Sequence, residues 1–245
     1  MTLRIALAGS PVHVAAEPLT SEAFASFGSV VQNPRPDLHP STASSSSSSA
    51  APLPRGAVSA NQGHAIQYRH ASQVRDLYAE RAPSRTASGP VVSVFVCAAR
   101  PLSSQGTFTV CVLERHPFTT QMFSPLVSSA DTYLVIVAPT LATSGADGTG
   151  ASHSSAVLSS GGLPDLRHLR AFVASGKQAV TYGAGTWHAP MVVLGREGTT
   201  LDFVVTQFAN GVPDEDCQVV EYEGDGCVDI RVSLKAPTTT TTSKL

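Results

Sequence analysis

Two ionisable residues near the middle of the chain have the types and the spacing that acid–base or metal chemistry needs. Glu114 and His116 stand two residues apart at the end of the apolar run 107–116. If that run is a β-strand, the two side chains share one face, about 7 Å apart. Such a pair could act as acid and base or as two metal ligands. Pro117 would end the ladder and leave the pair near a strand end. The alternative is a surface network of Glu114, Arg115 and His116.

His188 is a third candidate, because it follows the only tryptophan of the chain and a turn that contains Gly183 and Gly185. The G-x-x-H spacing of Gly185 and His188 resembles the second cupin motif, in which a turn aims a histidine into a barrel. Gln121 stands roughly where the first cupin motif has its last ligand. A buried structural histidine beside a core tryptophan is the alternative interpretation. The metal hypothesis is therefore a divalent ion held by oxygen and nitrogen ligands, which would be Glu114, His116, Gln121 and His188.

Apolar runs of strand length recur along the chain and predict the scaffold that positions these residues. They are rich in Val, Phe, Tyr and Thr and are separated by Gly, Pro and Asp, which favours a mainly β fold, an antiparallel barrel or sandwich with a few short peripheral helices. The expected strands are 91–98, 107–116, 132–138, 178–182, 190–194, 201–208 and 218–222. The expected helical segments are 21–27 with Thr20 as N-cap, 71–79, and 165–169 after Pro164.

Composition limits the classes of partner. The 245 residues have a formal net charge of -2 and only 14% charged residues, so no basic field attracts nucleic acid or an anionic membrane. No apolar run reaches the roughly 18 residues of a membrane span. We expect one domain over 1–236, with low-complexity insertions at about 39–54 and 142–162 and a flexible tail over 237–245. A small molecule is the expected partner.

Several segments together resemble one enzyme family, the ureidoglycolate lyases. They are ERHPFTTQMFSPL, TYLVIVAP, LRAFVASGKQAVTYGAGTWHAPM and DFVVTQF, and Asn61-Gln62-Gly63 resembles a short element that precedes the first long strand of that family. The resemblance covers most of 19–222 outside the insertions. It implies a cupin-like β-barrel, a homodimer, and cleavage of (S)-ureidoglycolate to glyoxylate and urea in allantoin and purine catabolism. One departure is Ala189, because relatives often have a second histidine there, which puts in doubt a mechanism that needs both imidazoles.

The implied reaction assigns roles to a short set of residues. A base must take the hydroxyl proton of the substrate, an acid must protonate the departing urea nitrogen, and a cation must hold the carboxylate. Glu114 or His116 is the expected base, and the other assists His188 as the acid. The expected substrate-binding residues are three cations, among which Arg115 ranks lowest because it points to the opposite face, and three hydrogen-bonding groups: Arg100, Lys177, Arg115, Asn61, Gln121 and Tyr182. No cofactor is certain, and a divalent metal ion stays open.

Two other functions compete with the lyase. One is a non-catalytic cupin-like module that binds a small carboxylate, and its discriminator is whether Glu114, His116 and His188 converge on one accessible cavity. The other is an amidohydrolase that releases ammonia, which normally needs two metals or an activated nucleophile. Ser243-Lys244-Leu245 matches the tripeptide that the peroxisomal import receptor reads, so we expect peroxisomal localisation, with a cytoplasmic fraction left open.

Overall fold

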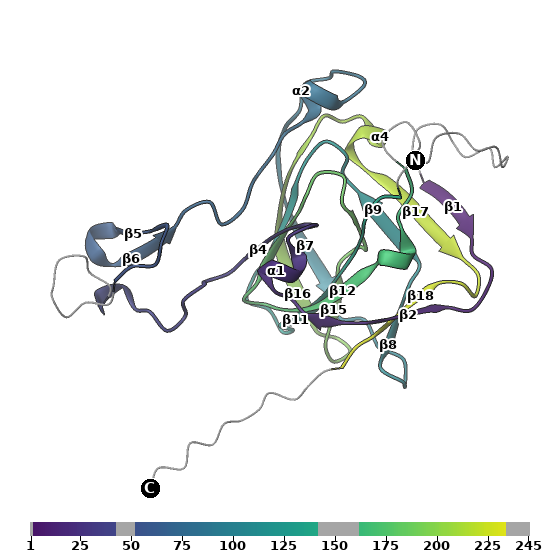
Figure 1. Ribbon diagram of the computed structural model, residues 1–245, viewed down its shortest axis with the longest axis horizontal. Coiled ribbons are helices and arrows are strands. Elements are labelled where there is room, and N and C mark those ends of the chain that lie inside the picture. The colour runs from purple at the N-terminus through teal and green to yellow at the C-terminus, as the bar shows by residue number, and fades with distance from the viewer. Residues whose placement is uncertain (1, 43–51, 142–161, 234–245) are drawn as a thin grey trace, which may run out of the picture.

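The computed structural model describes residues 2–42, 52–141 and 162–233. Strands from both halves of the chain form a twisted, mainly β body, and the helices among these residues are short and peripheral (Figure 1). This confirms the mainly β expectation and is consistent with a cupin-like fold. Among the described residues no helix is long and apolar enough to cross a membrane.

Three sheets build the body, and a separate two-stranded hairpin completes the described strands. The largest sheet has the order β1-β17-β9-β14-β11-β12-β3, and β15 also pairs with β11. Its strands are β1 Thr2–Ala6, β3 Glu17–Pro18, β9 Val112–Arg115, β11 Thr132–Ala138, β12 Arg170–Ser175, β14 Trp187–His188, β15 Val192–Leu194 and β17 Gln218–Glu223.

The second sheet has five strands in the order β4-β13-β10-β16-β7, and the third has the order β2-β18-β8. The strands of the five-stranded sheet are β4 Gly28–Val31, β7 Gly89–Ala98, β10 Gln121–Pro125, β13 Ala179–Tyr182 and β16 Thr200–Ala209. The remaining strands are β2 Val12–Ala15, β8 Thr107–Val110, β18 Val228–Arg231, and β5 Ala57–Ala60 with β6 Ala65–Tyr68 in the hairpin. Most pairings are antiparallel as expected, but β1, β2 and β3 pair in parallel with β17, β18 and β12, which the sequence analysis did not foresee.

The largest sheet buries side chains on both faces. Along β11, Tyr133, Val135 and Val137 pack with the five-stranded sheet, whereas Leu134 and Ile136 pack on the side of the three-stranded sheet. Alternate residues of a strand point to opposite faces, so a strand covered on both sides is apolar throughout. Two cores result, and β14 lies between them, with Trp187 in one core and His188 on the side of the other.

Most of the expected elements are present. β7, β11, β13, β15, β16 and β17 overlap the expected strands, and β15 is shorter than expected. Helix α1, Ser21–Phe24, has the predicted cap, since Thr20 Oγ1 accepts a hydrogen bond from Ala23 N at 3.1 Å. The helical segment after Pro164 is a 3-10 turn, η3, Leu166–His168. The other helical elements are α2 Tyr78–Arg81, α4 Pro213–Asp216, and the 3-10 turns η1 Pro40–Thr42 and η2 Asn61–Gly63.

Two expectations about local structure are wrong. The helix expected over 71–79 is absent, and α2 begins only at Tyr78. The strand expected over 107–116 is two strands, β8 and β9, interrupted at Cys111, whose carbonyl accepts a hydrogen bond from Tyr222 N at 2.7 Å. An extra residue in a ladder reverses the faces beyond it. Val110 and Leu113 therefore lie in the same core, so a single alternation does not run through both strands.

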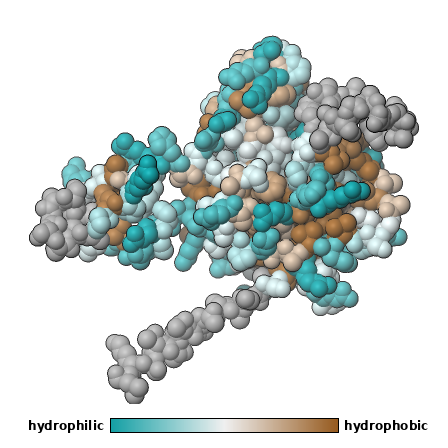
Figure 2. Space-filling model, viewed as in Figure 1, coloured by the Kyte–Doolittle hydropathy of each residue, from teal (hydrophilic) through white to brown (hydrophobic). Residues whose placement is uncertain are grey.

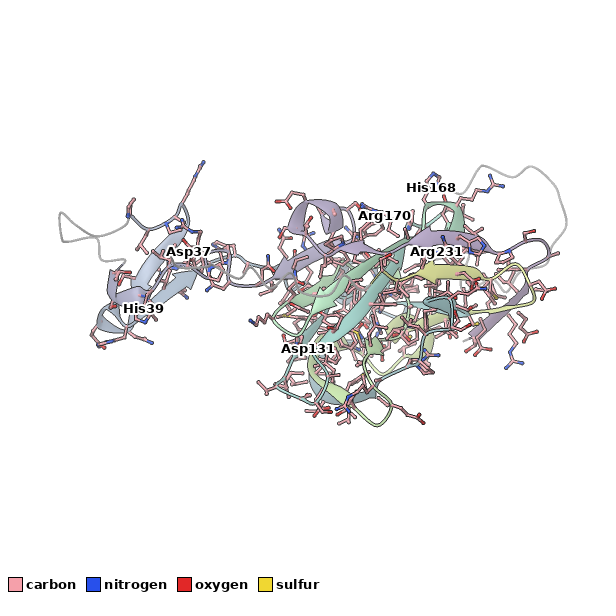
Figure 3. All side chains as sticks on the ribbon, turned by 90° about the horizontal axis from the view of Figure 1, so that it is seen from below. Asp37, His39, Asp131, His168, Arg170 and Arg231 are labelled. Carbon is pink, nitrogen blue, oxygen red and sulfur yellow. The ribbon has the colours of Figure 1, made fainter. Side chains whose placement is uncertain are left out.

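A segment between β4 and α2 stands away from the body. Residues 57–68 form the hairpin of β5 and β6, and Figure 2 shows this hairpin in a lobe joined to the body by a narrow neck. In the view turned by 90°, Asp37 and His39 lie on the same lobe, far from Asp131 and Arg170 on the body (Figure 3). We call residues 33–70 the arm.

Candidate functional site

His188 is held by the glycine-bearing turn that precedes it. Gly183 N donates to Phe27 O at 2.8 Å and Gly185 N donates to His116 O at 2.8 Å, so the turn is fixed to two neighbouring segments. Gly185 has φ +79°, a conformation that favours glycine. Nδ1 of His188 donates to Thr186 O at 2.9 Å. A carbonyl can only accept, so the proton of the neutral ring is on Nδ1 and Nε2 has a lone pair.

His116 is held in the same manner by a different element. Its Nδ1 donates to Asp216 O, at the end of α4, at 2.6 Å. Its Nε2 is buried and has no hydrogen-bond partner among the described residues. The rings of His116 and His188 lie with their centroids 5.6 Å apart. Both imidazoles are thus oriented through Nδ1 and present Nε2 to one region.

The predicted carboxylate and amide meet the two imidazoles. Glu114, His116 and His188 each offer one ligand atom, and these atoms lie within 4.8 Å of one another. Glu114 Oε1 lies 3.6 Å from His188 Nε2, and Gln121 Oε1 lies 3.1 Å from it. The side chain of Glu114 is 24% exposed, so the cluster is open to solvent at that point. The structure brings together the four residues that the metal hypothesis named.

Burial controls the charge of this cluster. It lowers the pKa of His188 to about 4 and the pKa of His116 to about 4, and at His116 the neighbouring His188 adds to the effect. Burial also raises the pKa of Glu114, although the charge of His116 opposes this. Both histidines are therefore neutral at neutral pH, with their Nε2 lone pairs free to accept a proton or to bind a metal.

Tyr182 and Gln207 complete the surroundings of His188. The ring of Tyr182 stacks on the imidazole with centroids 4.0 Å apart and an interplanar angle of 9°. Gln121 Nε2 donates to Gln207 Oε1 at 2.7 Å, which orients the amide of Gln121. Gln207 was not among the site residues predicted from the sequence. A signal was present, because Gln207 continues the inward row of Phe203 and Val205 along β16, and a polar residue in an apolar row is unusual.

Four of the predicted substrate-binding residues lie outside this cluster. Arg115 points to the opposite face, as expected, with Cζ 4.5 Å from the Trp187 ring centroid, and Arg100 packs over Phe108 in the same core. Lys177 is in the turn before β13, five residues from Tyr182, which is about 16 Å along an extended strand. Asn61 lies in η2 on the arm. In this structure none of Arg100, Arg115 and Lys177 therefore lies beside His188.

Ala189 also lies on the far side of the sheet. It is buried in the core that contains Trp187, and its N–H donates to Ile136 O at 2.9 Å. Because consecutive residues of an extended chain face opposite ways, position 189 points away from Glu114 and His116. The departure from the family pattern at this position removes no side chain from the cluster.

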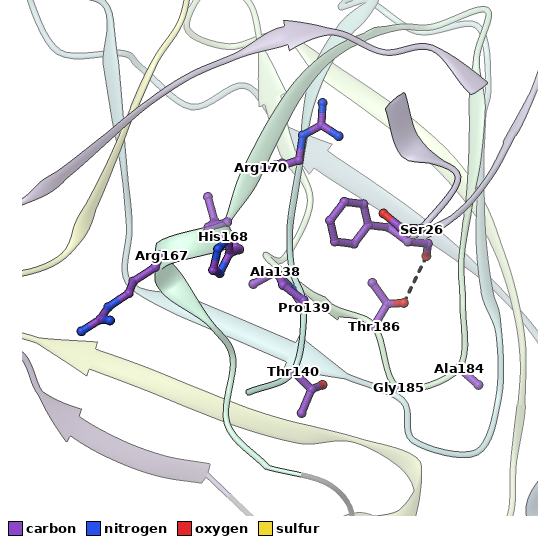
Figure 4. Close-up of a pocket in the computed structure, with 12 residues that line it drawn as sticks. Ser26, Ala138, Pro139, Thr140, Arg167, His168, Arg170, Ala184, Gly185 and Thr186 are labelled. Atoms are coloured by element: carbon purple, nitrogen blue, oxygen red, sulfur yellow. Dashed lines mark hydrogen bonds between the residues drawn. The ribbon is translucent and has the colours of Figure 1, made fainter. Parts of the chain in front are cut away.

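A large hollow lies beside this cluster and is separate from it. Figure 4 shows this pocket, of about 710 Å³, with Arg167, His168 and Arg170 on one side and the turn 184–186 on the other. Thr186 Oγ1 donates to Phe27 O at 3.1 Å in its wall. The pocket therefore borders the turn that holds His188 but does not contain the cluster. The expected targeting residues Ser243, Lys244 and Leu245 lie outside the described residues, as does most of both expected insertions.

Comparison with known proteins identifies the family. The family model described as ureidoglycolate lyase matches residues 11–229. A ureidoglycolate lyase of Schizosaccharomyces pombe is 37% identical over 223 residues, which cover 89% of this chain and 96% of that protein. One of Saccharomyces cerevisiae is 36% identical over 232 residues, 89% of this chain and 98% of that protein. One of Pseudomonas syringae is 27% identical over 189 residues, 77% of this chain and 79% of that protein. The chain belongs to the ureidoglycolate lyase family.

Proposed function

We propose that this protein cleaves (S)-ureidoglycolate to glyoxylate and urea, and that the cluster of Glu114, His116 and His188 is its active site. The observation that supports the site best is the convergence of these three side chains within 4.8 Å. A carbinolamide has a hydroxyl and a ureido nitrogen on one carbon. Its cleavage moves one proton from that hydroxyl to that nitrogen and consumes no water, which a compact set of proton-transfer groups can perform.

The protonation states of His116 and Glu114 indicate which group accepts and which group donates a proton. His116 Nε2 is neutral, buried and unpartnered among the described residues, so it can take the hydroxyl proton as the C=O bond of glyoxylate forms. Glu114 has a raised pKa and can deliver a proton to the urea nitrogen as the C–N bond breaks. A proton transfer from His116 to Glu114 then restores both groups. His188 is a positioning and hydrogen-bonding group, fixed by Thr186 and Tyr182.

The same residues fit a divalent metal ion. Acceptor atoms of two imidazoles, a carboxylate and an amide converge, and no donor that pairs with His116 Nε2 is present in the described chain. Converging lone pairs repel unless a proton or a cation lies among them, and this ligand set suits a borderline divalent ion. Such an ion would be held by Glu114, His116, Gln121 and His188 and would supply positive charge for the hydroxyl and carboxylate of the substrate. His116 would then be a ligand, and its Nε2 would not act as the base.

We also propose a homodimer and a peroxisomal location, both expected from the sequence. The homodimer is what the resemblance to the ureidoglycolate lyases implies, and the chain belongs to that family. The peroxisomal address is supported by Ser243-Lys244-Leu245 and by the run of threonines before it, which suits a receptor that binds an extended peptide.

A turnover assay with purified protein tests the reaction. Urea, glyoxylate and ammonia are quantified separately after incubation with (S)-ureidoglycolate. Urea and glyoxylate in equal amounts without ammonia are expected. Ammonia in place of urea would establish the amidohydrolase instead, and binding of ureidoglycolate without turnover would establish the non-catalytic module.

A further inference from the structure

The outer face of the five-stranded sheet is apolar at its edge. On β7 the outward side chains of Val92, Val94 and Val96 are 68%, 64% and 67% exposed. Their neighbours across the ladder are Thr206, Val204 and Asp202 of β16, and Met122 of β10 follows in the same row as Thr206. We call these seven residues the valine face. Three adjacent valines with more than half of their surface in water are unusual for a surface that remains free.

Two further features favour a partner on this face. β7 is ten residues long and is the edge strand of its sheet, and long apolar edges are normally blunted by charges or covered. Asp202 is the only carboxylate among the seven residues, and it makes no ion pair among the residues that the structure describes. A cation from a partner could therefore pair with it.

The arm lacks a core of its own, just as the valine face lacks a cover. No side chain in the described part of residues 33–70 is buried, and its strands β5 and β6 are only four residues long. An isolated two-stranded hairpin is marginally stable in water, so the arm needs a surface to pack on. Figure 1 shows that it extends from the side of the body where β4 and β7 lie. It has two arginines, Arg55 and Arg69, that make no ion pair in the described chain and could serve as donors to an acidic group.

The area of the valine face favours a dimer interface that also includes the arm. β7 and β16 each span about 33 Å, and three strands at about 4.8 Å spacing make the valine face roughly 14 Å wide. Such a plane gives roughly 450 Å² per copy, less than the about 800 Å² per partner of a stable interface. The face alone is therefore too small, and an arm that packs on the other copy would supply the remaining area.

We propose that the valine face packs against the same face of a second copy and that each arm lies on its partner. This rests on the homodimer proposed above and specifies its interface. Pairing of one patch with itself across a two-fold axis closes the assembly at two copies, which agrees with a single apolar edge per chain. The arm places an arginine, Arg55 or Arg69, near Asp202 of the partner.

The test compares Val94→Glu with the matched control Val12→Glu by sedimentation equilibrium of the full chain. Both valines are exposed residues of edge strands, but Val12 is on β2 of the three-stranded sheet, 42% exposed. The wild type and the control are expected to be dimers, and Val94→Glu a monomer with an unchanged circular dichroism spectrum. If Val94→Glu fails to fold, the near-isosteric Val94→Thr is expected to raise the dimer dissociation constant at least tenfold.

Hydrogen–deuterium exchange tests the arm. The amides of 57–60 and 65–68 are expected to be protected in the wild-type dimer and to exchange rapidly in the Val94→Glu monomer. A monomeric wild type would overturn the dimer itself, and a dimeric Val94→Glu would overturn only the valine face. If the arm amides exchange hydrogen equally fast in both proteins, the proposal that each arm packs on its partner is wrong. The urea-release assay is independent of these outcomes, so failure of the interface and failure of the lyase function are distinguished.

Discussion

His116→Asn is the sharpest test of the active site, because it removes Nε2 of the ring and keeps a donor at the position of Nδ1. The amide nitrogen of asparagine lies close to the position of Nδ1 and can still donate to Asp216 O, a bond of 2.6 Å in the wild type. Asparagine has no atom at the position of Nε2. The substitution therefore removes the proton acceptor, or metal ligand, and keeps the anchor.

The magnitudes follow from these two atoms. Loss of a general base lowers turnover typically by about 10² to 10⁴ fold, so kcat/KM of His116→Asn is expected to fall in that range. Its free energy of unfolding is expected to stay within about 1 kcal/mol of the wild type, since the Asp216 carbonyl keeps a donor. His116→Ala is expected to lose the same activity and also about 1 to 3 kcal/mol of stability, because that carbonyl is then unsatisfied.

The assay is urea release by the full chain, with urea denaturation as the measure of stability. His168→Asn is the matched control, since His168 also bonds through Nδ1, to Asp165 at 2.6 Å, but is exposed and outside the cluster. The control is expected to keep wild-type turnover. A folded His116→Asn protein with near-normal kcat/KM would refute the central role of His116 Nε2, whether as base or as ligand.

Three further predictions concern stability, metal and localisation. Burial raises the pKa of Glu215, but hydrogen bonds from Ser84 and Asn210 together outweigh it and hold the pKa below its usual value. Its charge therefore stabilises the fold above about pH 4.5, and this contribution is lost as the pH falls through the lowered pKa. Glu215→Gln is thus expected to cost about 1 to 3 kcal/mol at pH 7 and progressively less as the pH falls below about 4.5, by urea denaturation over that range. Elemental analysis is expected to find one divalent ion per chain, and less in Glu114→Gln; full activity after chelation would reject the metal. Deletion of Leu245 is expected to move a fluorescently tagged protein out of peroxisomes, and unchanged import would reject the address.

The sequence was informative where one strand decides which way a side chain points. The G-x-x-H spacing of Gly185 and His188 predicted a turn that aims a histidine inward, and His188 follows such a turn and is buried. The alternation of a strand predicted that Glu114 and His116 share a face, and both meet His188. Which core their strand faces was not predictable, because the interruption at Cys111 depends on a hydrogen bond from Tyr222, more than a hundred residues away.

Residues whose position depends on long-range contacts were not predictable in this way. Arg100 and Lys177 were chosen for their charge, which says nothing about the face or the end of a strand on which a side chain lies. Asn61 was chosen by resemblance, and its backbone has φ 49° with φ 52° at Gln62, a conformation that is uncommon outside glycine. The hairpin itself holds this turn, since Ala60 pairs with Ala65 and His64 N donates to Asn61 O at 3.0 Å. A left-handed turn of this kind depends on the pairing of β5 with β6, which the sequence analysis did not predict.

The alternation that joins His188 to the cluster also explains why Ala189 is compatible with the lyase activity. Beside Ala189, Arg100 and Phe108 line a hollow of about 90 Å³ on the side of the Trp187 core. A histidine at position 189 would point into that hollow, with a buried sheet between it and the substrate. Its imidazole could affect packing there but could not exchange a proton with a molecule bound at Glu114 and His116. Of the pair, only the first histidine can therefore contact a molecule bound at the cluster, and a relative with both is expected to use position 188 alone for that contact.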